Sequence, residues 1–430
     1  MGDFEHWGRH TLNELINVKH GYPFKSEYFA NQGEFIVLTP GNFWEVGGFK
    51  LQPGKEKFYS ATFPADYLLN KGDLIVAMTE QAEGLLGSMA IVPEDNRYLH
   101  NQRIGKVTAK TGDIFLDFLY HASKTRVVRE QLSNTASGSK VRHTSPERIC
   151  DVSIPLPPIA EQKKIAAVLS ALDAKIDLNN RINAELEALA KTIYDYWFVQ
   201  FDFPDAHGCP YKSSGGKMVW NDTLKREIPA GWEVRTLGSV ISRAGTGLNP
   251  RDNFVLGTGN NYYVTIKNVT NGRIVLDDKC DRIDDESMAI IDRRSQLQAG
   301  DVLFTSIEPV GVTYLIHEKP TNWNINESVF IIRPDTDVIS PEYLLMLLSS
   351  SEMKAFTKNS SAGSIHKGIR HAVLKSFGLA YAGRTLVDQF SSSLRPILQK
   401  MDNLDKQNRE LTCLRDWLLP LLMNGQVRIA

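Results

Sequence analysis

The most regular hydrophobic pattern in the chain lies between Pro157 and Phe198. Apolar residues recur there at spacings of three and four or their multiples, at Ile165, Val168, Leu172, Ile176, Leu186, Leu189, Ile193 and Trp197. This period predicts one long amphipathic helix, with Pro157 and Pro158 at its first turn, where a missing N–H costs nothing. At 1.5 Å per residue such a helix would span roughly 60 Å. That length exceeds one compact core and predicts a spacer that lies against a partner helix.

The predicted partner helix lies between Arg384 and Gln426. Its apolar positions are Val387, Phe390, Leu394, Ile397, Met401, Leu404, Leu411, Leu414, Leu418 and Leu421. Pro396 predicts a kink or a helix start inside this run, and Pro420 should disturb its last turn. Asparagines interrupt both runs, at Asn179, Asn180, Asn183 and Asn408. Asparagine in a helix seam can fix the register at some cost in stability, but these residues could also face solvent at the end of a shorter helix.

The two runs belong to an internal repeat. Lys175-Ile176-Asp177 matches Lys400-Met401-Asp402, 225 residues later. The same offset relates Trp7 to Trp232, Asn101 to Asn326 and Gly138-Ser139 to Gly363-Ser364, whereas Gly72-Asp73 matches Gly300-Asp301 at 228 and Gln162 matches Gln389 at 227. Chance is a poor explanation for an ordered series of this kind. We interpret the chain as two copies of a unit that consists of a globular domain followed by a long helix.

The predicted fold is a mixed α/β (α+β) fold in which two similar domains are joined by two long antiparallel helices. Short β-like runs punctuated by Gly and Pro precede a helical stretch, a small polar loop and a final strand in each copy. The predicted helical stretches are 114–132 and 341–357. A Pro-, Gly- and Ser-rich connector follows the first long helix, and Phe201, Phe203, Tyr211, Trp220 and Trp232 could anchor it to a surface. The predicted boundaries are 1–156 (first domain), 157–200 (first helix), 201–229 (connector), 230–383 (second domain) and 384–430 (second helix).

Composition narrows the class of protein. A net charge of -1 over 430 residues gives no global field for nucleic acid or membranes, so a nucleic-acid surface would have to be local. The four cysteines (Cys150, Cys209, Cys280 and Cys413) form no CxxC, which disfavours zinc sites and disulfides. No run approaches the ~18 apolar residues of a membrane span. The first ten residues, MGDFEHWGRH, lack the apolar core of a signal peptide, so we expect a cytoplasmic protein.

The sequence contains none of the catalytic motifs that were sought. GxxxxGK[ST], HExxH and the Asn/Asp-Pro-Pro-Tyr/Phe run of adenine methyltransferases are absent. The Pro-Asp pairs at Pro204-Asp205 and Pro334-Asp335 are not followed by a nuclease-like carboxylate and lysine set. Gly257-Thr258-Gly259 lacks a strand–turn–helix context and is interpreted as an ordinary loop. These observations favour a chain without an active site.

The order of motifs resembles the specificity subunit of type I restriction–modification enzymes. The resemblance depends on Ile154-Pro155-Leu156-Pro157-Pro158, on Glu161-Gln162 at the start of the helix and on Trp197-Phe198 at its exit. It continues through FDFP, GCPYKSSGGKMVW and Ile228-Pro229-Ala230-Gly231-Trp232, and Gly72-Asp73 and Asn101-Gln102 also fit. It covers nearly the whole chain. The second copy departs from it, because Gly378-Leu379-Ala380-Tyr381-Ala382 stands where IPLPP is expected.

The resemblance implies a function without catalysis. Each domain would recognise one half of a bipartite site in double-stranded DNA, and the antiparallel helices would set the spacing between the halves. The helices would dock two modification (methyltransferase) subunits, and two motor-nuclease restriction subunits would join them. The resemblance implies no cofactor and no metal for this chain, and it implies S-adenosylmethionine, ATP and magnesium in the partner subunits.

Basic residues cluster at equivalent places in the two copies. Residues 124–148 hold six Lys or Arg against two acids, and residues 354–375 hold five and no acid. Such charges suit phosphate contacts, which position a protein on DNA without recognising bases, although a solvated helix face would have the same composition. The loop residues among them are the stronger candidates: Lys140, Arg142, His143, His366, Lys367 and Arg370. The helical Lys124, Arg126, Lys354 and Lys358 are weaker candidates.

Base recognition needs forked donors and acceptors, which we expect in loops that differ between the copies. The candidates after the Gly-Asp strand are Thr79, Glu80 and Gln81 in the first copy, and Thr305, Ser306 and Glu308 in the second. The candidates early in each copy are Lys19, His20, Tyr22 and Lys25, and Arg243, Asn249 and Arg251. Each of these positions could also be polar only because it lies in a loop. Asn101 and Asn326 recur, and we assign them to turn stabilisation rather than to DNA contact.

Two other classes of function remain open at this point. One is a stand-alone DNA-modifying enzyme with an unrecognised site. The other is a coiled-coil adaptor without a role on DNA, which the near-neutral charge favours and the paired basic loops oppose.

Overall fold

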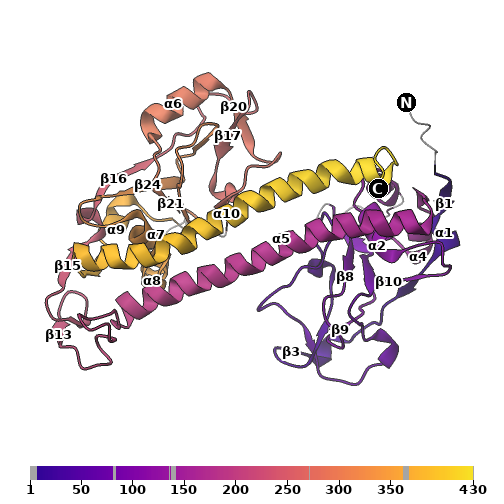
Figure 1. The fold of residues 1–430 in the computed structure, drawn as a ribbon, viewed down its shortest axis with the longest axis horizontal. Coiled ribbons are helices and arrows are strands. Elements are labelled where there is room, and N and C mark those ends of the chain that lie inside the picture. Colours follow the sequence, from indigo (N-terminus) through magenta and orange to yellow (C-terminus); the bar gives the residue numbers. More distant parts are fainter. Residues whose placement is uncertain are drawn as a thin grey trace. The chain divides into compact units, whose positions relative to one another are not determined.

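The computed structural model describes residues 7–80, 84–134, 136, 142–270, 272–361 and 368–429. The chain divides into two compact units, which are described separately. Unit 1 comprises Met1–Asn180 with Lys406–Ala430, and unit 2 comprises Arg181–Asp405. Each unit therefore contains one β-rich domain and a segment of each of two long helices, labelled α5 and α10 in Figure 1.

Unit 1 is built on a four-stranded antiparallel sheet in the order β2-β10-β6-β8. Smaller sheets pair β1 with β12 and β7 with β11, and join β3, β5, β4 and β9. The strands of the domain are β1 (Arg9–Thr11), β2 (Ile16–His20), β3 (Phe29–Ala30), β4 (Phe35–Val37), β5 (Phe58–Tyr59), β6 (Leu74–Ala77), β7 (Thr79–Glu80), β8 (Met89–Ile91), β9 (Tyr98–Leu99), β10 (Ile104–Ala109), β11 (Arg142–His143) and β12 (Ser153–Pro155). Its helices are α1 (Leu12–Leu15), α2 (Leu116–Ala122), α3 (Arg126–Asn134) and α4 (Pro146–Cys150).

The central strand β6 is buried on both faces of its sheet. Because successive side chains of a strand point to opposite faces, Leu74 and Val76 enter one core and Ile75 and Ala77 enter another. The first core includes α2, the start of α5 and the end of α10, and the second lies under β4 and β9. A strand covered in this way has a continuous apolar sequence, which explains why Leu74–Ala77 does not alternate with polar residues.

Unit 2 contains a sheet of the same order, β16-β24-β21-β22. Its strands are β13 (Met218–Asn221), β14 (Arg226–Pro229), β15 (Glu233–Thr236), β16 (Ile241–Thr246), β17 (Asn261–Val264), β18 (Val269–Thr270), β19 (Arg273–Ile274), β20 (Asp281–Ile283), β21 (Val302–Thr305), β22 (Thr313–Leu315), β23 (Trp323–Ile325), β24 (Val329–Pro334) and β25 (Gly378–Tyr381). Its helices are α6 (Asp285–Ser295), α7 (Pro341–Ser349), α8 (Ser351–Ser361) and α9 (His371–Lys375). In β21, Val302 and Phe304 enter one core and Leu303 enters the other, as in β6.

The matching order of strands confirms the internal repeat. The pair β15–β25 corresponds to β1–β12, so Gly378–Tyr381 forms a strand despite its departure from the expected letters. An ion pair also recurs, with Asp73–Lys106 at 2.6 Å in unit 1 and Asp301–Arg333 at 2.6 Å in unit 2. Each predicted helical stretch is two helices, because α2 ends at Ala122 before α3 and α7 ends at Ser349 before α8.

The long helices are α5 (Ile159–Tyr194), which continues as a π-helical turn over Asp195–Val199, and α10 (Arg384–Met423). In unit 1 the first half of α5 packs against the end of α10, and in unit 2 the second half of α5 packs against the start of α10. The two helices are therefore antiparallel, as predicted. The alternative of a helix start at Pro396 is wrong, because α10 begins at Arg384 and runs through Pro396 and Pro420.

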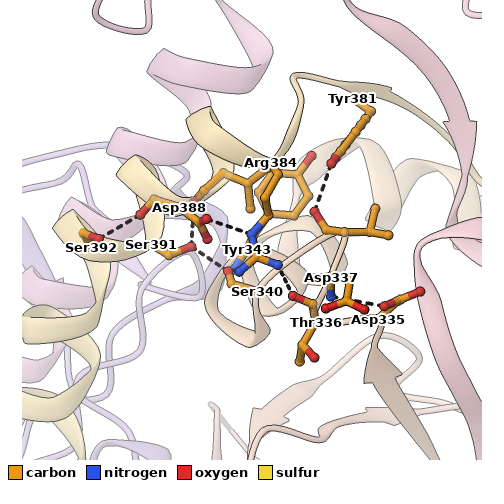
Figure 2. A network of polar contacts seen from close by, with 12 residues as sticks. Asp335, Thr336, Asp337, Ser340, Tyr343, Tyr381, Arg384, Asp388, Ser391 and Ser392 are labelled. Atoms are coloured by element: carbon orange, nitrogen blue, oxygen red, sulfur yellow. Dashed lines mark hydrogen bonds and ion pairs between the residues drawn. The ribbon is translucent and has the colours of Figure 1, made fainter.

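A polar network in unit 2 fixes the start of α10 (Figure 2). Arg384 donates to the Asp388 carboxylate at 2.8 Å and to the carbonyl of Thr336 in the segment before α7. Ser391 shares a 2.5 Å hydroxyl–hydroxyl hydrogen bond with Ser340, which caps α7 by accepting the N–H of Tyr343. The first turns of α10 and α7 are thus tied together by side chains.

Gln162 performs the corresponding task in unit 1. Its side chain is fully buried, accepts the N–H of Phe115 at 2.8 Å, and donates to the carbonyls of Asp113 and Pro157. Gln389, the residue matched to it by letters, is exposed. The match of Gln162 with Gln389 is wrong, because the helix starts, Ile159 and Arg384, align at an offset of 225 and not 227.

Polar residues occupy the middle of the helix pair. Within unit 1, Asn179 is fully buried and donates to Gln407 at 2.8 Å and to Asn408 at 2.9 Å. Within unit 2, Asn183 is 2% exposed and donates to Asp405 at 2.7 Å, and Asp405 also pairs with Arg273 at 2.9 Å. The prediction of asparagines in the seam is therefore correct for Asn179 and Asn183.

Some predicted apolar seam positions are wrong. Leu189 and Leu414 are 47% and 43% exposed, and Ala190 is buried in place of Leu189. The connector after α5 is anchored as predicted by Phe201 and Phe203, which are buried against Trp232. Trp220 is 60% exposed on the β13–β14 hairpin and anchors nothing within the described residues.

We predict that Phe390→Ala destabilises unit 2 by about 3–5 kcal/mol, since it removes a fully buried ring from a dense core. Phe390 is fully buried and contacts the rings of Trp197, Phe198 and Tyr343. Urea unfolding measures the change in the free energy of unfolding. Trp417→Ala is the matched control on the same helix, because its side chain is 62% exposed. Equal effects of the two substitutions would contradict the packing described here.

Candidate nucleic-acid interface

One edge of the unit 1 sheet gathers polar side chains from four segments. An open pocket of about 340 Å³ is lined there by His20, Met78, Thr79, Gln102, Arg103, His143 and Thr144. His20 ends β2 and pairs with Gly105 of β10, whereas Thr79 lies in β7, immediately after β6. His143 lies in β11, which pairs with β7. The sheet thus brings three predicted site residues, His20, Thr79 and His143, into one pocket.

A tight turn at Asn101 forms one side of this pocket. The Asn101 side-chain oxygen accepts the N–H of Arg103 at 2.9 Å, and the Asn101 carbonyl accepts the N–H of Ile104 at 2.9 Å. Gly21 passes so close that a Cβ there would lie 2.1 Å from the Asn101 carbonyl oxygen, which only glycine avoids. The predicted turn-stabilising role of Asn101 is confirmed.

Buried His100 supports the same turn from beneath. It is fully buried, and its Nε2 lies 2.9 Å from the Ile104 carbonyl oxygen. Burial lowers the pKa of His100 to about 4, which keeps the ring neutral, so Nε2–H donates to that carbonyl.

Interactions between β7 and β11 hold the opposite side of the pocket. Thr79 and His143 share a 3.1 Å hydrogen bond. Arg142 lies 3.4 Å from the Glu80 carboxylate, and Glu80 is 6% exposed and accepts the N–H of Gly84 at 2.6 Å. Glu80 and Arg142 therefore tie β7 to β11 and to Gly84, and His143 is the exposed residue of β11.

Unit 2 repeats this edge with different side chains. Asn326 accepts the N–H of Ser328 at 3.1 Å, and Gly247 takes the place of Gly21, with a Cβ there 1.7 Å from the Ile325 carbonyl oxygen. An isolated bridge between Ile307 and Gly368 replaces the β7–β11 pair. The turn-stabilising role predicted for Asn326 is confirmed as well.

Two predicted base-contacting residues lie inside unit 2. Thr305 is fully buried and Ser306 is 5% exposed. The Thr305 hydroxyl donates to Pro309 and accepts the N–H of Val312, and the Ser306 hydroxyl donates to the Ser328 carbonyl at 2.8 Å. This burial is a correction to the prediction, because neither hydroxyl is free to meet a base. Glu308, by contrast, is exposed.

The remaining predicted residues of unit 1 lie beside the pocket. Lys19 is exposed, lies 3.6 Å from Asp66 and stacks over the Tyr67 ring at 4.6 Å. Tyr22 packs edge-on against Phe24, and Lys25 lies 3.8 Å from Glu27. The aromatic packing gives Tyr22 a structural role, whereas the two lysines reach the surface.

In unit 2 the predicted residues are more dispersed. Arg243 donates to Gln296 and to the Arg294 carbonyl, both at 2.6 Å, which fixes β16 to the end of α6. Asn249 accepts from the Asn253 side chain within the same loop at 3.3 Å. Arg251 and Arg370 are exposed. The sites predicted at Gln81, Lys140, His366 and Lys367 lie outside the described residues.

The basic cluster of residues 124–148 is partly structural. Lys124 is 10% exposed and pairs with Asp173 of α5 at 2.7 Å. Arg129 donates to the carbonyls of Leu86, Glu45 and Gly84, and burial lowers its pKa. Asp173 is also paired with Arg415 of α10 at 3.0 Å, so these charges join the turn between α2 and α3 to α5 and α10 within unit 1. Lys124 and Arg129 are thus not available to phosphates.

Sequence reasoning missed Gln102 and Arg103. Both are exposed and line the pocket. The signal that could have found them is their position immediately after Asn101, the residue that recurs at Asn326. A recurring turn residue marks the place where a fixed backbone can present variable side chains.

The described residues contain no group of three or more His, Cys, Asp or Glu that could hold a metal ion. In the same part of the chain, no helix has the length and apolar character needed to cross a membrane.

Comparison with known proteins defines the class. Residues 5–188 match the family model described as type I restriction modification DNA specificity domain. Several relatives that carry the name specificity subunit match over three quarters or more of the length of both proteins. The chain is thus similar over most of its length to proteins named as specificity subunits of type I restriction enzymes, and its first half matches the DNA specificity domain of these systems.

Two relatives and one solved structure illustrate the match. The MjaIX specificity subunit of Methanocaldococcus jannaschii is 26% identical over 80% of this chain and 76% of its own length. The EcoBI specificity subunit of Escherichia coli is 24% identical over 93% of this chain and 81% of its own. A crystal structure of the type I restriction–modification S subunit from M. genitalium covers 98% of this chain and 97% of its own with a TM-score of 0.60 at 15% identity, which shows the same fold.

We predict that unit 1 loses stability as the pH falls from about 6.5 to 4. Burial lowers the pKa of His100 to about 4 and of His121 to about 3. In that window the unfolded chain binds protons that the folded chain excludes. The free energy of unfolding therefore decreases as the pH is lowered, by up to about 3 kcal/mol for one such histidine. Urea unfolding at several pH values measures the slope.

The matched variant for this prediction is His100→Gln. Its amide can still donate to the Ile104 carbonyl but does not titrate, so the pH slope should be smaller than in the unsubstituted protein. An unchanged slope would contradict the assignment of a neutral His100.

Proposed function

We propose that each domain recognises one half of an asymmetric, bipartite site in double-stranded DNA. The observation that supports this most directly is the recurrence of one sheet edge in both units with unlike side chains. In unit 1 the edge presents His20, Gln102, Arg103 and His143, whereas in unit 2 it presents Glu308, Glu327 and Arg370. Two unlike surfaces on one scaffold suit two different half-sites, because base edges are distinguished by the pattern of donors and acceptors that meets them.

The exposed cations give the sequence-independent part of binding in this proposal. Lys19, Lys25, Arg251 and Arg370 reach the surface near the two edges and suit phosphate contacts. Lys140 and Lys367, predicted from sequence, are kept as further candidates for the same contacts. Phosphate contacts would orient each domain, and the sheet edge would supply the discrimination between bases.

The long helices act as a spacer between the half-sites in this proposal. α5 has 36 residues, which corresponds to about 54 Å of helix. Buried Asn179 and Asn183 support a fixed register, since a slip of the helices would leave their amides without the partners Gln407, Asn408 and Asp405. A fixed register gives one gap between the halves rather than a range of gaps.

The exposed apolar residues on the helices support docking of partner subunits. Leu178, Leu189, Leu414 and Trp417 are 42%, 47%, 43% and 62% exposed. Large apolar side chains in such numbers on helices suit an interface with the modification subunits, because their burial would be favourable. The modification subunits would supply S-adenosylmethionine-dependent methylation, and restriction subunits would supply motor and nuclease activities with ATP and magnesium, in the cytoplasm.

Binding of duplex DNA by the chain with its modification subunit tests this function. We expect the affinity of the complex for duplex DNA to depend on the DNA sequence. We also expect the affinity for every duplex to fall as the salt concentration rises. Methylation by the chain alone with S-adenosylmethionine would indicate a stand-alone enzyme. Assembly without any DNA shift would indicate an adaptor. Either result would contradict the proposal.

We predict that removing one heptad from both α5 and α10 shortens the preferred gap between half-sites and leaves the halves unchanged. Seven residues correspond to about 10 Å, or about three base pairs at 3.4 Å each. The deletions should avoid the segments that contain Asn179, Asn183, Gln407 and Asn408, so that the polar contacts re-form.

The measurement is the site preference of the assembled complex on a library of duplexes with variable gaps. The matched control is a complex whose helices carry one exposed substitution each and no deletion. An unchanged gap in the deletion variant would contradict the spacer role.

A further inference from the structure

The turn after each recurring asparagine has the same backbone in the two units. In unit 1, Asn101 accepts from the N–H groups of Arg103 and Ile104, and the Arg103 carbonyl accepts the N–H of Met78 at 2.9 Å. In unit 2, Asn326 accepts from Ser328 and Val329, and the Ser328 carbonyl accepts the N–H of Ser306 at 2.9 Å. Because the same three hydrogen bonds hold both turns, position 102 is structurally equivalent to position 327, and position 103 is equivalent to position 328.

The side chains at these matched positions are chemically opposed. Unit 1 carries Gln102 and Arg103, which are rich in donors, and unit 2 carries Glu327 and Ser328, in which a carboxylate accepts. Gln102, Arg103 and Glu327 are exposed, and Ser328 is partly exposed. Within the part of the chain that the structure describes, none of these four side chains makes a hydrogen bond or an ion pair, although their backbones are fixed.

A fixed backbone with unengaged polar side chains differs from the other polar positions nearby. Glu80 and Arg142 engage each other, and the Ser306 and Thr305 hydroxyls are satisfied internally. A fixed backbone presents these side chains from a defined position, and because they are unpaired they give up no internal hydrogen bond on binding, which suits recognition of a ligand. The pocket beside Gln102 and Arg103 is open, so a base edge could approach both side chains there.

We propose that positions 102–103 and 327–328 are matched specificity positions of the two domains. This inference rests on the proposed function. Arg103 would donate to the two acceptors on the major-groove edge of guanine, with Gln102 bonding the adjacent base. Glu327 would accept from the exocyclic amino group of cytosine, with Ser328 as a short adaptable partner. The two half-sites would thus differ at equivalent positions because the turn residues differ.

The test exchanges the turn residues between the units. The double substitution Gln102→Glu with Arg103→Ser gives unit 1 the turn residues of unit 2. The double substitution Glu327→Gln with Ser328→Arg gives unit 2 the turn residues of unit 1. Each variant is assembled with the modification subunit, and the recognised site is determined by mapping methylated adenines and by binding to duplexes that carry single base changes.

We expect each exchange to change base preference at one or two adjacent positions of one half-site only. Discrimination at that position should fall by about 5- to 150-fold, the range for loss of one good bidentate contact. The other half-site and the gap should not change. Arg103→Lys should lose the same discrimination but keep the salt dependence of binding, because it keeps the charge and loses the planar fork.

The control variant is Arg97→Ser. Arg97 precedes β9, is 46% exposed and pairs with Glu94 at 3.7 Å. The substitution therefore removes the same charge from the same domain at a position outside the Asn101 turn. Its site preference should match that of the unsubstituted complex.

Three outcomes would overturn the inference. The first is an unchanged preference in exchanged variants that unfold at the same temperature as the unsubstituted chain. The second is a uniform loss of affinity for all duplexes with a smaller salt slope, which would make Arg103 a phosphate contact. The third is retained discrimination in Arg103→Lys. The proposed function would survive all three, whereas absence of any sequence preference in the unsubstituted complex would contradict that function itself.

Discussion

Burial of one inner strand of each sheet on both faces, β6 in unit 1 and β21 in unit 2, limits where either domain can bind a ligand. In β6 and β21 alternate side chains enter two different cores, so neither face of the strand is free for a ligand. The ends of the strands remain, and the chain must leave the sheet there in turns. Gly21 and Gly247 allow those turns to pass against the carbonyls of Asn101 and Ile325 at distances that a side chain would forbid. The proposed recognition edge lies at these turns, where the backbone is fixed and the side chains differ between the units.

The ends and the middle of the long helices have different structural roles. Their ends are apolar and belong to the domain cores, with Leu422 and Met423 in unit 1 and Phe390 and Leu394 in unit 2. Their middle is polar, with Asn179, Asn183 and Asp405 in paired contacts. An apolar seam tolerates slippage, whereas buried amides with specific partners disfavour it. Apolar packing at the ends therefore holds the helices together, and the hydrogen bonds in the middle fix their register.

Much of the fold could be predicted because the patterns are long or repeated. The helix period, the 225-residue offset and the recurring Asn101 and Asn326 all found their counterparts in the structure. One local prediction, a helix start at Pro396, is wrong. Pro396 does not begin a helix, because packing of Phe390 and Leu394 in the core holds the preceding turns of α10. Leu189 and Leu414 fit the period but face outward, since periodicity alone does not define which side of a long helix is covered.

The candidate site was less predictable because polar loop residues serve structure as often as recognition. Glu80 and Arg142 pair with each other, Lys124 pairs with Asp173, and Thr305 is buried, none of which the sequence indicates. Gln102 and Arg103 were missed because only the turn before them recurs. We propose a role for them because their backbone positions are equivalent to those of Glu327 and Ser328.

We propose that one duplicated scaffold presents two different recognition edges. Mapping methylated adenines across a genome at single-base resolution, with and without the gene for this chain, tests it most directly. We expect the methylation that is lost with the gene to lie in one motif with two unlike halves and a gap of constant length. A continuous motif, two identical halves, or methylation that does not depend on the gene would contradict it.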